Sequence, residues 1–183
     1  MEESTEQPSL VNHAVKWGII LGAVSVVMTM LLYVVDYTIL VLIKYLLVVL
    51  ALNIGVVIYA GIDYRRSLGG YLAYGKAWKH GAIVFVLATA ISVVFGSLLY
   101  FVIDTELPQK LTDAAIENQR AMMEGFGAPA DAIEQGIQEA KERAKDQYTA
   151  VGMLKGFGIF SIFWLVIALL TSLITRKNEP IEM

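Results

Sequence analysis

The sequence predicts an all-α integral membrane protein, a four-helix bundle with an extracytoplasmic helical hairpin between spans 3 and 4. Two observations lead to this fold class. Of the 183 residues, 57% are hydrophobic and only 17% are charged, whereas soluble domains carry about 25% charged residues. The apolar residues also gather in four runs of 19, 21, 22 and 18 residues, at 17–35, 39–59, 82–103 and 157–174. Since roughly 20 apolar residues cross a bilayer core, we expect a single membrane domain over residues 1–183.

Basic residues set the expected direction of the chain, because loops rich in Lys and Arg stay on the cytoplasmic side. The loop between the second and third runs contains Arg65, Arg66, Lys76 and Lys79. The connection at 36–38 has no basic residue, and segment 104–150 carries ten acidic residues against five basic ones. We therefore expect both termini inside and segment 104–150 outside. The acidic start, Met-Glu-Glu-Ser-Thr-Glu, is unlike a cleaved signal peptide, so the first run should remain in the mature protein.

Small residues spaced four apart predict where the four helices pack. In lipid the hydrophobic effect does not drive helices together, so they associate through close contacts that small residues permit. The helix-packing candidates are Gly18 and Gly22 in the first run, Ser92 and Gly96 in the third, and Gly152 and Gly156 before the fourth. The same residues could equally form a homo-oligomer. Aromatic residues favour the membrane interface, and we expect Tyr33, Tyr37 and Tyr100 at the outer one.

The first and third runs are similar at an offset of 67 residues. Between 23–35 and 90–102, eight of thirteen positions are identical. A duplicated helical hairpin, with both copies entering the membrane from the same side, would explain this similarity. A chance match is the alternative, because apolar helices are composed of only a few residue types.

Segment 104–150 is predicted to form a polar helical hairpin. The arm at 106–124 carries an apolar stripe at helical spacing, residues 125–128 break the pattern, and Pro129 suits the start of a second arm. The turn carries Met122, Met123 and Phe126. We interpret these three as partner-interface candidates, because Met-rich surfaces suit adaptable binding. The alternative is a tip that folds back between the arms.

The residue inventory predicts no catalytic, metal or cofactor site. The chain has no Cys, which excludes a thiol nucleophile and Cys-ligated zinc or iron–sulfur clusters. His13 and His80 lie just outside the runs near the inner surface, lack the spacing of a zinc helix, and are expected as interfacial polar residues. Lys44 is expected to reach the outer interface from within its span. The net charge of −3 argues against nucleic acid as a partner.

Residues 69–81, Gly-Gly-Tyr-Leu-Ala-Tyr-Gly-Lys-Ala-Trp-Lys-His-Gly, resemble the stretch that enters the third span in a bacterial membrane family. This family is domain of unknown function 4199. The stretch from Leu99 to Asp104, at the outer end of the third span, is similar to a second shared feature. The resemblance covers most of residues 10–178 and implies four spans in a bacterial cytoplasmic (inner) membrane. It implies no activity and no catalytic residues.

These observations together predict a multi-pass membrane protein of unknown function that is not an enzyme. We expect an accessory or scaffold protein whose hairpin contacts a membrane or extracytoplasmic protein, with the lipid bilayer as its surroundings. A small transporter or channel subunit is the alternative. The repeat favours this alternative, and the lack of acidic residues within the four runs disfavours it.

Overall fold

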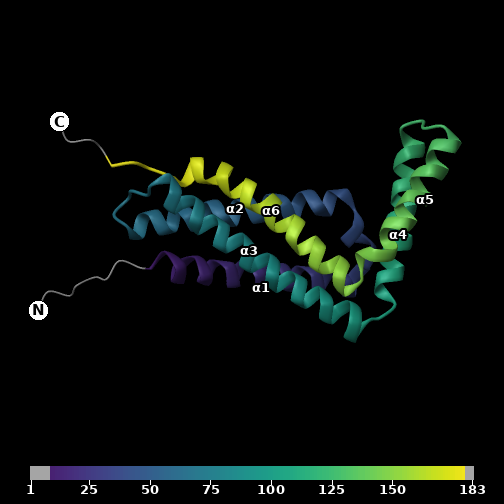
Figure 1. Cartoon of the computed structure of the whole chain (residues 1–183), viewed down its shortest axis with the longest axis horizontal. Coiled ribbons are helices and arrows are strands. Elements are labelled where there is room, and N and C mark those ends of the chain that lie inside the picture. Colours follow the sequence, from purple (N-terminus) through teal and green to yellow (C-terminus); the bar gives the residue numbers. More distant parts are fainter. Residues whose placement is uncertain (1–8, 180–183) are drawn as a thin grey trace, which may run out of the picture. The chain divides into compact units, whose positions relative to one another are not determined.

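The computed structural model describes residues 9–179, and this part of the chain folds as an all-α protein (Figure 1). The α-helices are α1 (Leu10–Asp36), α2 (Ile43–Ser67), α3 (Tyr74–Leu98), α4 (Leu107–Gly125), α5 (Ala130–Gln147) and α6 (Ala150–Thr175). A 3-10 segment, η1 (Tyr37–Val41), joins α1 to α2, and a π segment, η2 (Leu99–Ile103), follows α3. The acidic N-terminal residues that argue against a signal peptide lie outside the described range.

Four helical stretches of the described residues are long and apolar enough to cross a membrane. They are Leu10–Val41, Ile43–Ser67, Tyr74–Ile103 and Ala150–Thr175, with mean hydropathy between 2.3 and 2.5. The prediction of an all-α protein with four long apolar helices is confirmed. One boundary differs, because the second run was expected from residue 39 whereas α2 begins at Ile43. The reason lies at Asp36, which leaves the helical conformation and accepts a hydrogen bond from the Thr38 N–H at 2.9 Å.

Glycines end two of the helices where the chain must turn. Gly69 and Gly70, just after α2, have φ of 80° and 97°, and Gly127, just after α4, has φ of 73°. L side chains rarely adopt this left-handed conformation, so glycine is the residue that permits each turn. The second of these turns joins α4 to α5, which lie side by side (Figure 1).

The chain forms two compact units, and unit 1 comprises residues 9–25, Leu50–Ile91 and 159–179. Its buried core includes Leu21 of α1, Val57 of α2, Phe85 of α3 and Ala168 of α6. Phe85 stacks on Trp164, with ring centroids 4.5 Å apart. Parts of all four long apolar helices therefore share one core.

The connection between α2 and α3 is tied to the segment after α6 within unit 1. Leu72 and Lys177 form an isolated antiparallel bridge, with backbone N–H to carbonyl distances of 2.8 and 3.0 Å. The Arg65 guanidinium also donates to the Thr175 carbonyl oxygen at 3.1 Å. The Arg65 bond satisfies a carbonyl group that the end of α6 leaves open.

Unit 2 comprises Val26–Val49 and Ser92–Gly158 and therefore contains α4 and α5. Its buried core consists of Leu99, Leu107 and Leu111. The sequence-based expectation of a single membrane domain stays a prediction.

Candidate functional site

The hairpin formed by α4 and α5 starts from a buried base in unit 2. Leu107 and Leu111 of α4 pack with Leu99 of η2, and aromatic side chains surround them. Tyr100 and Tyr148 meet edge to face with centroids 5.3 Å apart and planes at 84°. Burial raises the pKa of Tyr148 to about 12, so its hydroxyl is neutral at physiological pH. The base therefore holds both ends of the hairpin, the start of α4 and the end of α5.

A polar clamp completes this base. The Asp104 carboxylate accepts hydrogen bonds from the Tyr33 hydroxyl at 3.2 Å and from the Glu106 N–H at 3.1 Å, and it pairs with Lys110 Nζ at 3.4 Å. Burial works to raise the pKa of Asp104, but these hydrogen bonds and the Lys110 charge outweigh it and lower the pKa. The pKa of Lys110 is raised, mainly by the hydrogen bond that the Lys110 ammonium donates to the Glu106 side chain. Both groups therefore stay charged at neutral pH.

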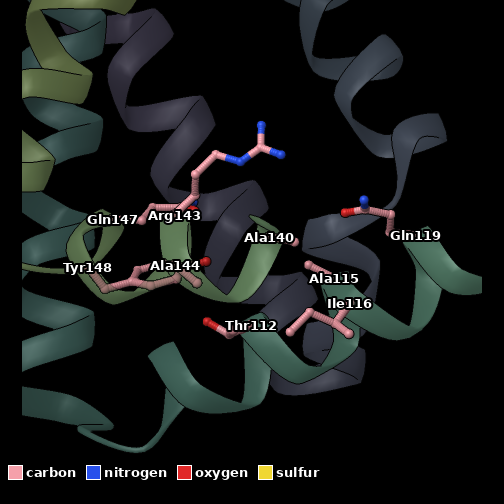
Figure 2. Close-up of a pocket in the computed structure, with 9 residues that line it drawn as sticks. All are labelled: Thr112, Ala115, Ile116, Gln119, Ala140, Arg143, Ala144, Gln147 and Tyr148. Atoms are coloured by element: carbon pink, nitrogen blue, oxygen red, sulfur yellow. The ribbon is translucent and has the colours of Figure 1, made fainter. Parts of the chain in front are cut away.

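Further along the hairpin, a cavity of about 390 Å³ lies between the two arms (Figure 2). The side chains that line it are Thr112, Ala115, Ile116 and Gln119 of α4, Ala140, Arg143, Ala144 and Gln147 of α5, and Tyr148. Arg143 bonds to Glu139 on its own helix, at 3.4 Å from Nη2 to Oε2. The alanines are too small to fill the space between the arms.

The three partner-interface candidates at the turn have different environments. Phe126 is 84% exposed and Met122 is 52% exposed. Met123 is half-buried and packs on α5, where a Cβ at Gly136 would lie 3.2 Å from the Met123 sulfur. Gln119 reaches the same place and donates to the Gly136 carbonyl oxygen at 3.2 Å. Met123 thus lies between the arms, while Met122 and Phe126 face outward.

The helix-packing candidates of α1 lie against α3. A Cβ at Gly18 would be 3.0 Å from Leu87 Cβ, and a Cβ at Gly22 would be 2.7 Å from Ile91 Cδ1. A closer approach that the sequence did not suggest joins α2 to α6, where a Cβ at Gly61 would lie 2.6 Å from Thr175 Cγ2.

The other helix-packing candidates lie in unit 2. A Cβ at Gly96 would be 3.6 Å from Met153 Cε, and Ser92 is half-buried on the same helix. At Gly152 a Cβ would meet the Asp146 carbonyl oxygen, so this glycine serves the turn between α5 and α6. A Cβ at Gly156 would meet nothing within 4 Å. Helix packing at Gly156 therefore stays a prediction.

The structure also brings together the two histidines, which were expected as interfacial polar residues with no contact predicted between them. His13 Nδ1 of α1 lies 2.9 Å from His80 Nε2 of α3. Their separation of 67 residues equals the offset of the repeat between the first and third apolar runs. That equality is the one signal in the sequence that could have identified the pair.

Comparison with known proteins gives one informative result. A family model described as "Protein of unknown function (DUF4199)" matches residues 16–177. Searches of curated proteins and of solved structures found no match to the chain.

Proposed function

Because this chain belongs to the DUF4199 family of proteins of unknown function, we propose a function from its own geometry. It is a multi-pass accessory protein of the bacterial cytoplasmic membrane, without enzymatic activity, that binds a protein partner on the extracytoplasmic side. The observation that carries the proposal is the exposure of Phe126, 84% accessible, at the tip of a hairpin with a buried base.

Charge supports the orientation. Basic residues cluster in and around the connection between α2 and α3, and Arg176 and Lys177 follow α6. Both places belong on the cytoplasmic side by the positive-inside rule. The hairpin, which lies between α3 and α6 in the chain, is then extracytoplasmic.

The base supports a binding role because it pre-organises the hairpin. The clamp at Asp104 and the aromatic contact between Tyr100 and Tyr148 hold the two arms before any partner arrives. A pre-organised element loses less conformational freedom on binding, so more of the contact energy appears as affinity.

The charge of the outer half of the hairpin indicates the chemistry of the partner. Between 117 and 139 the acidic residues are Glu117, Glu124, Asp131, Glu134 and Glu139, against one basic residue, Arg120. An apolar tip within an acidic surface fits an apolar pocket bordered by basic side chains, since complementary charge favours encounter and register.

Photo-crosslinking in the native host tests this proposal. A photoreactive amino acid at Phe126 is expected to give one discrete crosslinked protein. The same group at Glu142, an exposed residue of α5 paired with Lys145, is the matched control and should give none. Crosslinks of equal strength at both positions, or none at Phe126, would contradict the proposal.

Two serine variants separate binding from folding. Met122→Ser with Phe126→Ser should abolish the crosslink at a reporter placed on Glu124 while leaving thermal stability unchanged, because both side chains face outward. Truncating an interface anchor commonly costs about 2 kcal/mol or more. Met123→Ser should instead lower stability, because Met123 packs on Gly136. If the double variant at Met122 and Phe126 lowers thermal stability instead, these two side chains belong to the core of the hairpin.

A small transporter or channel subunit is the alternative, and the 67-residue repeat is the observation that favours it. Purification in mild detergent distinguishes the two functions. A stoichiometric protein partner supports the accessory role, whereas a monodisperse homo-oligomer with no partner supports the alternative.

A further inference from the structure

Polar side chains from three helices meet inside unit 1. His13 of α1 lies between His80 of α3, with 2.9 Å from His13 Nδ1 to His80 Nε2, and Asp63 of α2, with 3.3 Å from His13 Nε2 to Oδ2. The Trp17 indole N–H donates to the same carboxylate oxygen at 3.3 Å. His80 is fully buried, and its Nδ1 is a buried atom with no hydrogen-bond partner among the described residues. These groups form a continuous chain of hydrogen bonds from Asp63 to His80.

The chemistry of imidazole determines which nitrogens of His13 and His80 act as hydrogen-bond donors. A neutral imidazole carries one N–H, and the Asp63 carboxylate accepts, so His13 carries its proton on Nε2. Nδ1 of His13 then accepts from the Nε2–H of His80, which leaves Nδ1 of His80 as a bare acceptor. The reverse arrangement would leave a buried N–H without a partner, which folded proteins avoid more strictly than an unpaired acceptor.

One end of the chain of hydrogen bonds is open and the other is closed. The Asp63 side chain is 45% exposed, and that of His13 is 12% exposed. At the other end, Tyr64 stacks on His80 with ring planes at 7°, and the neighbouring α3 residues Val84 and Phe85 belong to the buried core. Among the described residues, exchange with solvent is therefore possible from the Asp63 side alone in this conformation.

The charged and titratable groups around the pair are few in the described part of unit 1. Asp63 and Tyr64 come from α2. On α6 the Thr171 hydroxyl lies 3.9 Å from where a Cβ at Gly81 would be, and it bonds to the Ala168 carbonyl oxygen. Arg65 of α2 is directed to the Thr175 carbonyl oxygen. The basic residues nearest in the chain on α1 and α3 are exposed, and they are Lys16, Lys76 and Lys79. The charge that acts directly on the pair is thus the carboxylate of Asp63.

We propose that His13 and His80 form one shared proton-binding site, open to solvent through Asp63 and closed toward the core of unit 1. In the protonated pair, His13 carries an N–H on both nitrogens. It donates Nε2–H to Asp63 and Nδ1–H to His80 Nε2. The N–H of His80 moves from Nε2 to Nδ1, and because Nδ1 is closed to solvent in this conformation, this change of tautomer takes place while the His80 ring is transiently exposed. One N–H has been added overall, and its positive charge lies on His13 beside the carboxylate.

The pair binds one proton and not two. A second proton would place two imidazolium charges on rings whose nitrogens are 2.9 Å apart, in a buried position where like charges strongly oppose each other. Binding of the first proton also gives His80 a buried N–H that faces apolar side chains. Protonation therefore links the pH on one side of the protein to the packing of α3 in unit 1. On the proposed topology that side is the cytoplasm, although the proton site itself does not depend on the topology.

Nitrogen NMR of the full chain in lipid nanodiscs tests this proposal. His13 and His80 are the two histidines of the sequence, so ¹⁵N-histidine labelling with a histidine-free tag reports on this pair without other signals. We expect both imidazoles to change in a single transition between about pH 8 and 4.5, with uptake of one proton per chain. Two separate transitions with two protons taken up, or no transition, would overturn the proposal.

A matched pair of variants tests the role of the carboxylate. Asp63→Asn removes the counter-ion of His13, so the joint transition should move to lower pH by about one unit or more. Asp36→Asn is the control, because Asp36 caps Thr38 in unit 2 and touches neither histidine. An unchanged transition in Asp63→Asn, or an equal shift in both variants, would show that Asp63 does not hold the proton site.

Discussion

Gly22 lies where α1 and α3 approach most closely in unit 1 among the predicted packing positions. A Cβ there would be 2.7 Å from Ile91 Cδ1 and 2.9 Å from Ile91 Cβ, so Gly22→Ala forces the isoleucine and its backbone to move. Overpacking a filled core costs about 1–3 kcal/mol. Gly55→Ala is the matched control, because a Cβ at Gly55 meets nothing within 4 Å. Both residues lie inside helices of unit 1, so the gain in helix propensity, about 1 kcal/mol, cancels between the two variants.

We therefore expect the free energy of unfolding of Gly22→Ala to be about 1–3 kcal/mol below that of Gly55→Ala, or about 5- to 150-fold in the equilibrium constant. Reversible unfolding by SDS in mixed micelles, followed by Trp fluorescence, measures this difference. Gly61→Ala should behave like Gly22→Ala, because its Cβ would lie 2.6 Å from Thr175 Cγ2. Equal stability of the Gly22 and Gly55 variants would refute the inference that α1 packs on α3 through this glycine.

Three other predictions concern the clamp, Lys44 and the topology. Because the pKa of Asp104 is lowered in the folded state, its stabilisation is present above its unfolded pKa of about 3.9 and is lost as the pH falls through the folded value. Limited proteolysis should thus show the hairpin loosening below about pH 4, a pH dependence that Asp104→Asn should lack. Lys44→Met should leave expression and thermal stability unchanged, since Lys44 is exposed and no ion pair is found for it among the described residues; complete loss of function at normal expression would contradict this. In cells with a permeable outer envelope, an impermeant thiol reagent should label Glu124→Cys and spare Asn178→Cys, and the reverse pattern would invert the topology.

The helices were predictable because the signals that define them are local. Four apolar runs of membrane length, the Gly-rich break after Glu124 and the Pro at 129 are each read within one stretch of chain, and each corresponds to a helix or a helix end in the structure. The start of α2 was not predicted, because it depends on how the Asp36 side chain bonds to the backbone of Thr38.

Small residues marked Gly18 and Gly22 as packing positions, but which helix faces which was not predictable, because hydropathy does not separate a buried face from a lipid-facing one. Leu21 is buried while Val24 and Val27 on the same helix are 43% and 58% exposed, although all three are apolar. Hydropathy alone therefore could not show that His13 faces His80. Nor could it show that Tyr33, expected in an interfacial belt, donates to Asp104 at the base of the hairpin.

The contact between His13 and His80 also bears on the ancestry of the fold. If the 67-residue repeat reflects duplication, the two histidines descend from one residue, and that residue now touches its own copy. A position that meets its equivalent lies on the axis that relates the two copies, as at an isologous dimer interface. A single ancestral hairpin would then have formed this contact between two identical chains. Fusion of two such hairpins into one chain would let Asp63 lie beside one histidine of the pair without a second carboxylate beside the other.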